Sequence, residues 1–159
     1  MHIIAPTMDN QAEIVISKED AVFWMDGNGR WRNAHGEFRH KKVIEYFHTS
    51  IVKDKGGYFL RQVLGDTVEK VYFRYEETPV FVFEVILGED IILVLNTGRR
   101  IRLDPDRLYV KGDHLFMHAG EEVVKFTDRS MMKISPFIEE KKGQFYFGRN
   151  AEHHLIQHE

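Results

Sequence analysis

Two segments of this 159-residue chain share one pattern of turns and apolar residues. Residues 23–60 and residues 109–147 each read as a hairpin, an amphipathic helix, a glycine turn and an aromatic strand. The glycine turn at residues 26–28 aligns with the one at residues 111–113. Such a repeat predicts a duplicated architecture, and two related halves create a cleft in which ligands often bind.

Helical spacing occurs twice. Apolar residues at Val43, Ile44, Phe47 and Ile51 predict a helix over residues 40–52, ended by the glycines that follow. A second helix is expected over 127–138, with Thr127 or Asp128 as N-cap and an early end or kink at Pro136. The expected strands cover residues 21–25, 30–33, 58–61, 68–75, 80–87, 91–95, 100–103, 115–118, 123–126 and 144–148.

From residue 68 onward, about seven short antiparallel strands precede one helix, which is the order of pleckstrin-homology-like folds. We therefore expect an α+β protein with duplicated hairpin–helix–strand units, antiparallel sheets and a C-terminal pleckstrin-homology-like half-barrel closed by a helix. The chain is expected to comprise an N-terminal extension (1–20), a small α/β unit (21–62), the half-barrel (63–148) and a mobile polar tail (149–159).

Composition excludes several classes of function. The 22 Lys and Arg residues against 25 Asp and Glu residues give a net charge of −3, which favours neither nucleic acid nor an acidic membrane as a partner. There is no cysteine, and no apolar run approaches the roughly 18 residues of a membrane span. Residues 1–12 lack the basic and apolar regions of a signal peptide, so a cytoplasmic protein is expected.

No catalytic residue, cofactor or metal site is predicted. None of the four serines lies in a nucleophile elbow, and no phosphate-binding glycine loop is present. His114 and His118 lie four apart on an expected strand, roughly 13 Å from each other, too far to share one ion. His154 and His158 could chelate a metal only if the tail were helical, a question that the sequence leaves open.

The arginines after the turn at Asn96 and Thr97 are better candidates. Arg100 and Arg102 share one face of the expected strand, and each guanidinium is a planar fork suited to phosphate or carboxylate. Asn96 and Thr97 could donate hydrogen bonds to the same anion. The alternative is an edge strand whose charges prevent aggregation.

Aromatic residues supply a further candidate set. Arg30 and Trp31 offer a cation and a ring close to the acceptor Asp26, and Tyr109 offers a second ring on which a base could stack. The alternative for Trp31 is a place in the core, where most tryptophans are largely buried.

A series of short motifs between Ala21 and Leu103 resembles a known bacterial family, named domain of unknown function 1285, in its order and spacing over about eighty residues. The motifs are Asp26-Gly27, Gly29-Arg30-Trp31, His35-Gly36, Arg39, Val43–Phe47, Asp54, Gly57–Leu60, Val68–Val71 and Glu76–Val80. Residues 77–81 and 105–109 also look like the related eukaryotic family named domain of unknown function 4505.

The resemblance implies a duplicated α+β fold with a pleckstrin-homology-like C-terminal part. It implies no established activity, but a role in signal transduction with a nucleotide-like ligand between the halves. The chain departs from the family at Val80, where a Phe would follow Pro79, and in the second helix, which carries Ser130-Met131-Met132 and Pro136.

The leading interpretation is a non-enzymatic module that holds a small anionic or nucleotide-like ligand between its halves. The candidate residues are Arg30, Trp31, Asn96, Thr97, Arg100, Arg102 and Tyr109. One alternative is a protein-interaction domain that docks a partner peptide on a sheet edge. The other is an enzyme of unknown reaction, and a homodimer formed through a sheet edge stays open.

Overall fold

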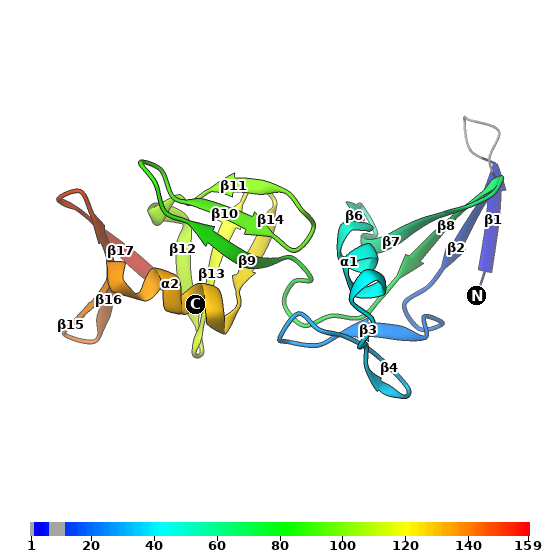
Figure 1. Ribbon diagram of the computed structural model, residues 1–159, viewed down its shortest axis with the longest axis horizontal. Coiled ribbons are helices and arrows are strands. Elements are labelled where there is room, and N and C mark those ends of the chain that lie inside the picture. Colours follow the sequence, from blue (N-terminus) through cyan, green and yellow to red (C-terminus); the bar gives the residue numbers. More distant parts are fainter. Residues whose placement is uncertain (1, 7–11) are drawn as a thin grey trace. The chain divides into compact units, whose positions relative to one another are not determined.

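The computed structural model describes residues 2–6 and 12–159, with side chains from residue 12 onward (Figure 1). The chain divides into two compact units, Met1–Pro79 and Val80–Glu159. Each unit contains its own sheets, and both combine strands with short helices, so the chain is an α+β protein as the sequence predicts.

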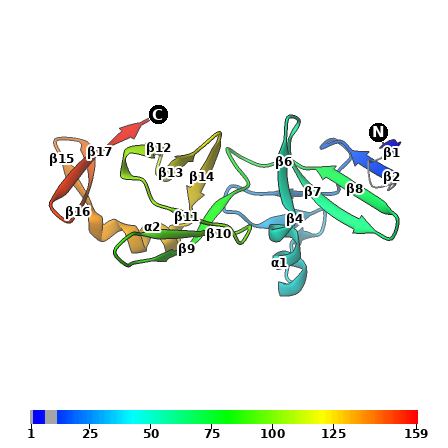
Figure 2. The same cartoon turned by 90° about the horizontal axis from the view of Figure 1, so that it is seen from above.

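A five-stranded sheet forms one part of the first unit (Figure 2). Its order is β1 (His2–Pro6), β2 (Ala12–Ile16), β8 (Thr67–Tyr72), β7 (Gly57–Leu64) and β6 (Ile51–Asp54). The β2–β8 pair is parallel, and the other neighbours are antiparallel. The sheet is therefore mixed rather than purely antiparallel.

A three-stranded sheet and a helix complete the first unit. They are β3 (Phe23–Met25), β4 (Trp31–Asn33), β5 (Gly36–Glu37) and α1 (Lys41–Thr49). Edge-to-face ring contacts join Trp31 to Phe47 and Phe73, with centroids 5.3 and 4.9 Å apart. Aromatic burial of this kind supplies a large apolar area to a small core.

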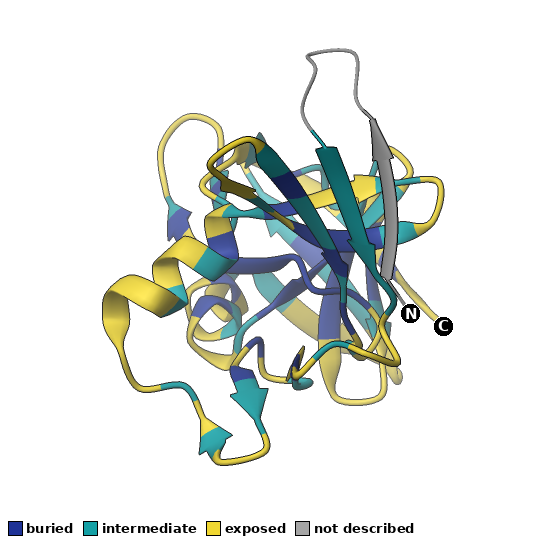
Figure 3. Cartoon of the chain, turned by 90° about the vertical axis from the view of Figure 1, so that its right-hand side faces the viewer, coloured by how far each residue is buried: buried dark blue, intermediate teal, exposed yellow. Residues whose placement is uncertain are grey.

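The second unit contains one nine-stranded sheet. Its order is β11 (Arg100–Arg102), β10 (Ile92–Leu95), β9 (Phe81–Ile86), β14 (Glu122–Phe126), β13 (His114–Ala119), β12 (Leu108–Lys111), β17 (Glu152–His158), β16 (Gln144–Arg149) and β15 (Ile138–Lys141). The β9–β14 and β12–β17 pairs are parallel. Buried positions follow the strands, whereas the turns are exposed (Figure 3).

Three short helices accompany this sheet: η1 (Pro105–Arg107), α2 (Asp128–Ile134) and η2 (Ser135–Phe137). Thr127 caps α2, because its Oγ1 accepts a hydrogen bond from the Ser130 backbone N–H at 3.1 Å. Pro136 cannot donate an α-helical hydrogen bond, and α2 ends before it. The sequence predicted both the cap and the early end.

The predicted repeat recurs as an order of elements. The series β3, β4, β5, α1, β6 and β7 in the first unit corresponds to β12, β13, β14, α2, β15 and β16 in the second. The turn at Gly27 lies between β3 and β4, and the turn at Gly112 lies between β12 and β13. The repeat in the sequence therefore correctly indicated that both units share this order of elements.

Three boundaries differ from those expected. Part of the N-terminal extension (1–20) belongs to the sheet as β1 and β2, while its residues 1 and 7–11 lie outside the described ones. The division expected between residues 62 and 63 falls inside β7, whereas the compact units divide after Pro79. Helix α1 ends at Thr49, because the β-branched pair Ile51 and Val52 begins β6 instead of continuing the helix.

The prediction of a mobile polar tail (149–159) was wrong. Residues 152–158 form β17, which pairs with β16 on one side and β12 on the other. Ile156 is 1% exposed and anchors the strand in the core, although its neighbours in the sequence are mostly polar. Because three strands follow α2, that helix is not the last element of the unit.

No helix in the described part of the chain is both long and apolar enough to cross a membrane.

Candidate functional site

An open pocket of about 440 Å³ lies at one end of the five-stranded sheet. Because β2 and β8 are parallel, both end on the same side, and the antiparallel strand β7 begins there. Three tyrosines and two cations dominate its lining, and we call it the tyrosine pocket: Lys18, Tyr58, Tyr72, Arg74 and Tyr75. Its volume falls within the range of small-molecule sites.

Aromatic rings form the apolar part of the tyrosine pocket. The ring of Tyr75 makes edge-to-face contacts with Tyr58 and Phe73, with centroids 5.6 and 5.8 Å apart. Burial raises the pKa of Tyr75 above its usual value. Its phenol therefore stays protonated at neutral pH, so the wall combines a ring face with a hydroxyl group.

The turn between β6 and β7 shapes another wall. Gly57 has a φ of +113°, a conformation that residues with a side chain rarely adopt. A Cβ on Gly56 would lie 3.1 Å from the hydroxyl oxygen of Tyr72. The glycine pair thus permits both the turn and the close approach of Tyr72.

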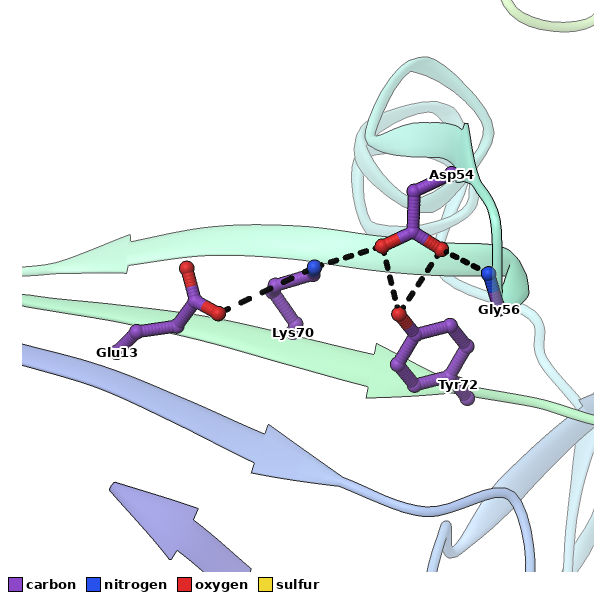
Figure 4. A network of polar contacts seen from close by, with 5 residues as sticks. All are labelled: Glu13, Asp54, Gly56, Lys70 and Tyr72. Carbon is purple, nitrogen blue, oxygen red and sulfur yellow. Dashed lines mark hydrogen bonds and ion pairs between the residues drawn. The ribbon is translucent and has the colours of Figure 1, made fainter. Parts of the chain in front are cut away.

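A polar network holds this turn against β8 (Figure 4). The Asp54 carboxylate accepts hydrogen bonds from Gly56 N–H at 2.8 Å, from Lys70 Nζ at 2.8 Å and from Tyr72 Oη at 2.7 Å. Glu13 Oε1 lies 4.0 Å from the same Lys70 nitrogen (Figure 4). Residues from three strands and one turn are therefore tied together beside the pocket.

The pKa directions define the charges in this network. Burial opposes ionisation of Asp54, but hydrogen bonds from Lys70, Tyr72 and Gly56 outweigh it and lower the pKa of Asp54. Burial and the bond to Asp54 raise the pKa of Tyr72. Tyr72 is therefore a protonated donor to an ionised carboxylate, and this hydrogen bond fixes the wall of the pocket.

Two cations line the pocket. Within residues 12–159, the Lys18 ammonium and the Arg74 guanidinium form no ion pair or side-chain hydrogen bond. The Arg74 backbone is nevertheless fixed, because its carbonyl accepts from the Met25 N–H at 3.0 Å. Two unpaired cations beside aromatic rings suit an anionic ligand with a flat body.

The first unit places two of the predicted residues away from this arrangement. Trp31 is 1% exposed and donates from Nε1 to Nδ1 of His48 at 3.2 Å, so it cannot stack on a ligand. It is the core residue that the alternative interpretation described. Arg30 is exposed, and its Nε lies 3.3 Å from Glu37 Oε1.

Asn96 and Thr97 form the turn between β10 and β11. The Asn96 side chain is committed to the fold, because its Oδ1 accepts from the Phe81 N–H at 2.9 Å, and the residue is 6% exposed. Thr97 Oγ1 is buried without a hydrogen-bond partner among the described residues. The Asn96 amide and the Thr97 hydroxyl are therefore both buried and do not form a solvent-exposed pair of donors for an anion.

The other candidates lie on different strands of the second unit. Arg100 and Arg102 are exposed on β11, and Arg102 is 3.9 Å from Asp90. Tyr109 is 6% exposed on β12, and its ring stacks on Phe116 and His118. In the sheet order four strands separate β11 from β12, so these residues do not form one contiguous site along the sheet.

Of the tail histidines, His154 has carboxylate partners. His154 Nδ1 lies 2.7 Å from Asp106, and its Nε2 lies 3.3 Å from Glu152. The hydrogen bond with Asp106 is the main reason that the pKa of His154 is raised. Within the described residues, no group of three or more His, Asp or Glu side chains is arranged to hold a metal ion.

Comparison with known proteins identifies the fold. No protein-family model matches the chain, and no curated protein sequence does either. A DUF1285 family protein from Silicibacter pomeroyi DSS-3 superposes with a TM-score of 0.62 and 11% identity, covering 96% of this chain and 84% of that one. The fold is that of DUF1285 proteins.

A second DUF1285 family protein, from Shewanella baltica OS155, superposes with a TM-score of 0.51 and 12% identity. The match covers 72% of this chain and 91% of the Shewanella chain. The resemblance noted in the sequence is thus matched in three dimensions. DUF1285 denotes a domain of unknown function, so neither similarity assigns an activity. At this level of identity the DUF1285 fold carries no site residues from one protein to another.

None of the site residues predicted from the sequence lines the tyrosine pocket. Lys18 fell in the segment expected to be an extension, and Arg74 and Tyr75 follow β8 without a local motif. The available signal was the run of β-branched residues Ile14, Val15 and Ile16, which favours a strand. Only the parallel pairing of β2 with β8 brings these segments to one place.

Proposed function

We propose that this protein is a non-enzymatic binding module for a small anionic molecule with a flat, partly apolar body, and that the tyrosine pocket is its site. The observation that carries the proposal is a pair of cations, Lys18 and Arg74, that have no ion-pair partner within residues 12–159 and lie at a pocket walled by aromatic rings. A phosphorylated nucleoside has this combination of a stacking base and an anionic group.

The polar network supports binding rather than catalysis. Asp54 is occupied by three donors, and the raised pKa of Tyr72 keeps its phenol protonated. These groups stiffen the wall, and a rigid wall lowers the entropic cost of binding. A module of this kind would act in cytoplasmic signalling, by responding to the concentration of its ligand.

The test is a thermal-shift screen of the full chain with nucleoside monophosphates, cyclic nucleotides and phosphorylated sugars. A ligand present at about 100 times its dissociation constant adds roughly 2.7 kcal/mol, or about 5–10 °C for a chain of this size. The doubly substituted K18Q/R74Q variant should lose most of that shift. Both side chains are exposed, so the substitutions should leave the fold intact.

Arg61→Gln is the matched control, because Arg61 is an exposed cation on β7 of the same sheet and does not line the pocket. It should retain the full shift. A shift of equal size in K18Q/R74Q would place the ligand elsewhere. If none of the three ligand classes raises the melting temperature, the proposal is contradicted.

A further inference from the structure

Strand β11 leaves one edge of the nine-stranded sheet open, since among the described residues it pairs only with β10. The Leu95 N–H donates to the Arg99 carbonyl, and the Leu103 N–H donates to the Ile91 carbonyl, each at 2.8 Å. Residues that exchange backbone bonds alternate along an antiparallel pair with residues that do not. Ile101 therefore bonds to β10, and the N–H and C=O groups of Arg100 and Arg102 point outward.

The side chains on this edge also alternate. Arg100 and Arg102 lie on the exposed face, whereas Ile101 pairs with Leu93, which is fully buried, on the other face. Arg102 lies 3.9 Å from Asp90, and both side chains are more than half exposed, so this pair stabilises the fold very little. Arg100 has no ion pair within the described residues.

We propose that β11 is a docking edge for an extended acidic segment of a partner protein, which adds to the sheet as one more strand. Backbone hydrogen bonds would come from the outward N–H and C=O groups of Arg100 and Arg102. The segment's acidic side chains would lie beside the two guanidinium groups, and the apolar residue between them would extend the apolar face at Ile101. The expected pattern is acidic, β-branched, acidic.

The charges of the edge select this partner. Arginines on an open edge repel a basic strand and discourage unselected pairing, but the same charges attract an acidic one. Pairing of β11 with its own copy would bring four arginines together, which opposes a symmetric dimer. Because this edge belongs to the second unit, the proposal does not depend on the tyrosine pocket of the first unit.

The first measurement is hydrogen exchange by NMR on the full chain, with and without an acetylated, amidated pentapeptide of alternating glutamate and valine. In the free protein the Ile101 amide should exchange slowly, and the amides of Arg100 and Arg102 should exchange fast. The peptide should slow exchange at Arg100 and Arg102 at least tenfold. A lysine–valine peptide of the same length is the control and should leave exchange unchanged.

Two substitutions separate strand addition from simple charge attraction. Arg100→Pro removes an outward N–H without removing a bond to β10, but it also removes a charge. It should therefore weaken binding of the glutamate–valine peptide more than Arg100→Gln, which removes the same charge and keeps the N–H. The R100Q/R102Q variant should weaken that binding at least tenfold, and Arg107→Gln, an exposed arginine on η1, should not. The spectra of the variants show whether β10 and β11 keep their pairing.

Several outcomes would overturn the proposal. Protection of other amides instead of those of Arg100 and Arg102 would place the peptide elsewhere. Binding of the peptide by Arg100→Pro as tight as its binding by Arg100→Gln would indicate charge attraction without strand addition. Association of the free chain through β11 would assign the edge to a second copy. The K18Q/R74Q variant should bind the peptide normally, so this proposal and that for the pocket fail separately.

Discussion

A neutral histidine lies in the aromatic core of the first unit. His48 is 6% exposed, and its Nδ1 accepts the indole N–H of Trp31. Burial lowers the pKa of His48 from 6.5 to about 4. Since Nδ1 is an acceptor, the proton of the neutral ring is on Nε2. The core of the first unit therefore holds a histidine that is uncharged at neutral pH.

We predict that this histidine makes the first unit sensitive to acid. The unfolded chain takes up the proton near pH 6.5 and the folded chain only near pH 4, so the free energy of unfolding should fall across this interval by about 3 kcal/mol. His48→Gln keeps an acceptor for Trp31 but does not titrate. The free energy of unfolding of this variant, measured with urea, should therefore fall less between pH 7 and pH 5 than that of the wild type. His35→Gln, on an exposed histidine, should behave like the wild type. Equal pH dependence in all three proteins would contradict the prediction.

At the scale of elements, the residues of β17 contribute unequally to the stability of the second unit. Adjacent residues of this strand point to opposite sides: Ile156 is 1% exposed and Leu155 is 41% exposed. Ile156→Ala should lower the free energy of unfolding by about 2–5 kcal/mol, because it leaves a cavity in the core. Leu155→Ala removes a similar volume at the surface and should cost much less. Chemical unfolding measures both, and equal small costs would mean that the strand does not anchor the unit.

Elements set by local sequence were predictable, and those set by distant pairing were not. Helical spacing located α1 and α2, and glycine turns located the hairpin that precedes each of them. The parallel pairings of β2 with β8 and of β12 with β17 have no local signature, because the partners lie far apart in the chain.

The candidate site follows the same rule. Trp31 was visible as an aromatic residue, but only the fold shows that its indole is buried against His48. Arg100 and Arg102 were correctly placed on one strand, and their edge position depends on the sheet order. Lys18 and Arg74 come together because β2 and β8 end side by side.

For the whole molecule, every sheet lies within one of the two units, and each unit has its own buried residues. Domains of this size bury roughly 60% of the surface that the unfolded chain exposes, which is sufficient for independent folding. The position of the division then determines which fragments can fold. Strand β8 lies between β2 and β7, so a division before β8 removes the centre of the five-stranded sheet.

We therefore predict that the fragments 1–79 and 80–159 each fold when expressed alone. The fragment 1–62 should not, because it contains β2 and most of β7 without the strand that joins them. Dispersion of amide signals and a cooperative urea transition would show folding, and Trp31 reports directly on the core shared by 1–79 and 1–62. If 1–62 folds as well as 1–79, the prediction is wrong. Strand β8 would then be dispensable to the unit that contains the tyrosine pocket, and the division between residues 62 and 63 that the sequence suggested would be correct.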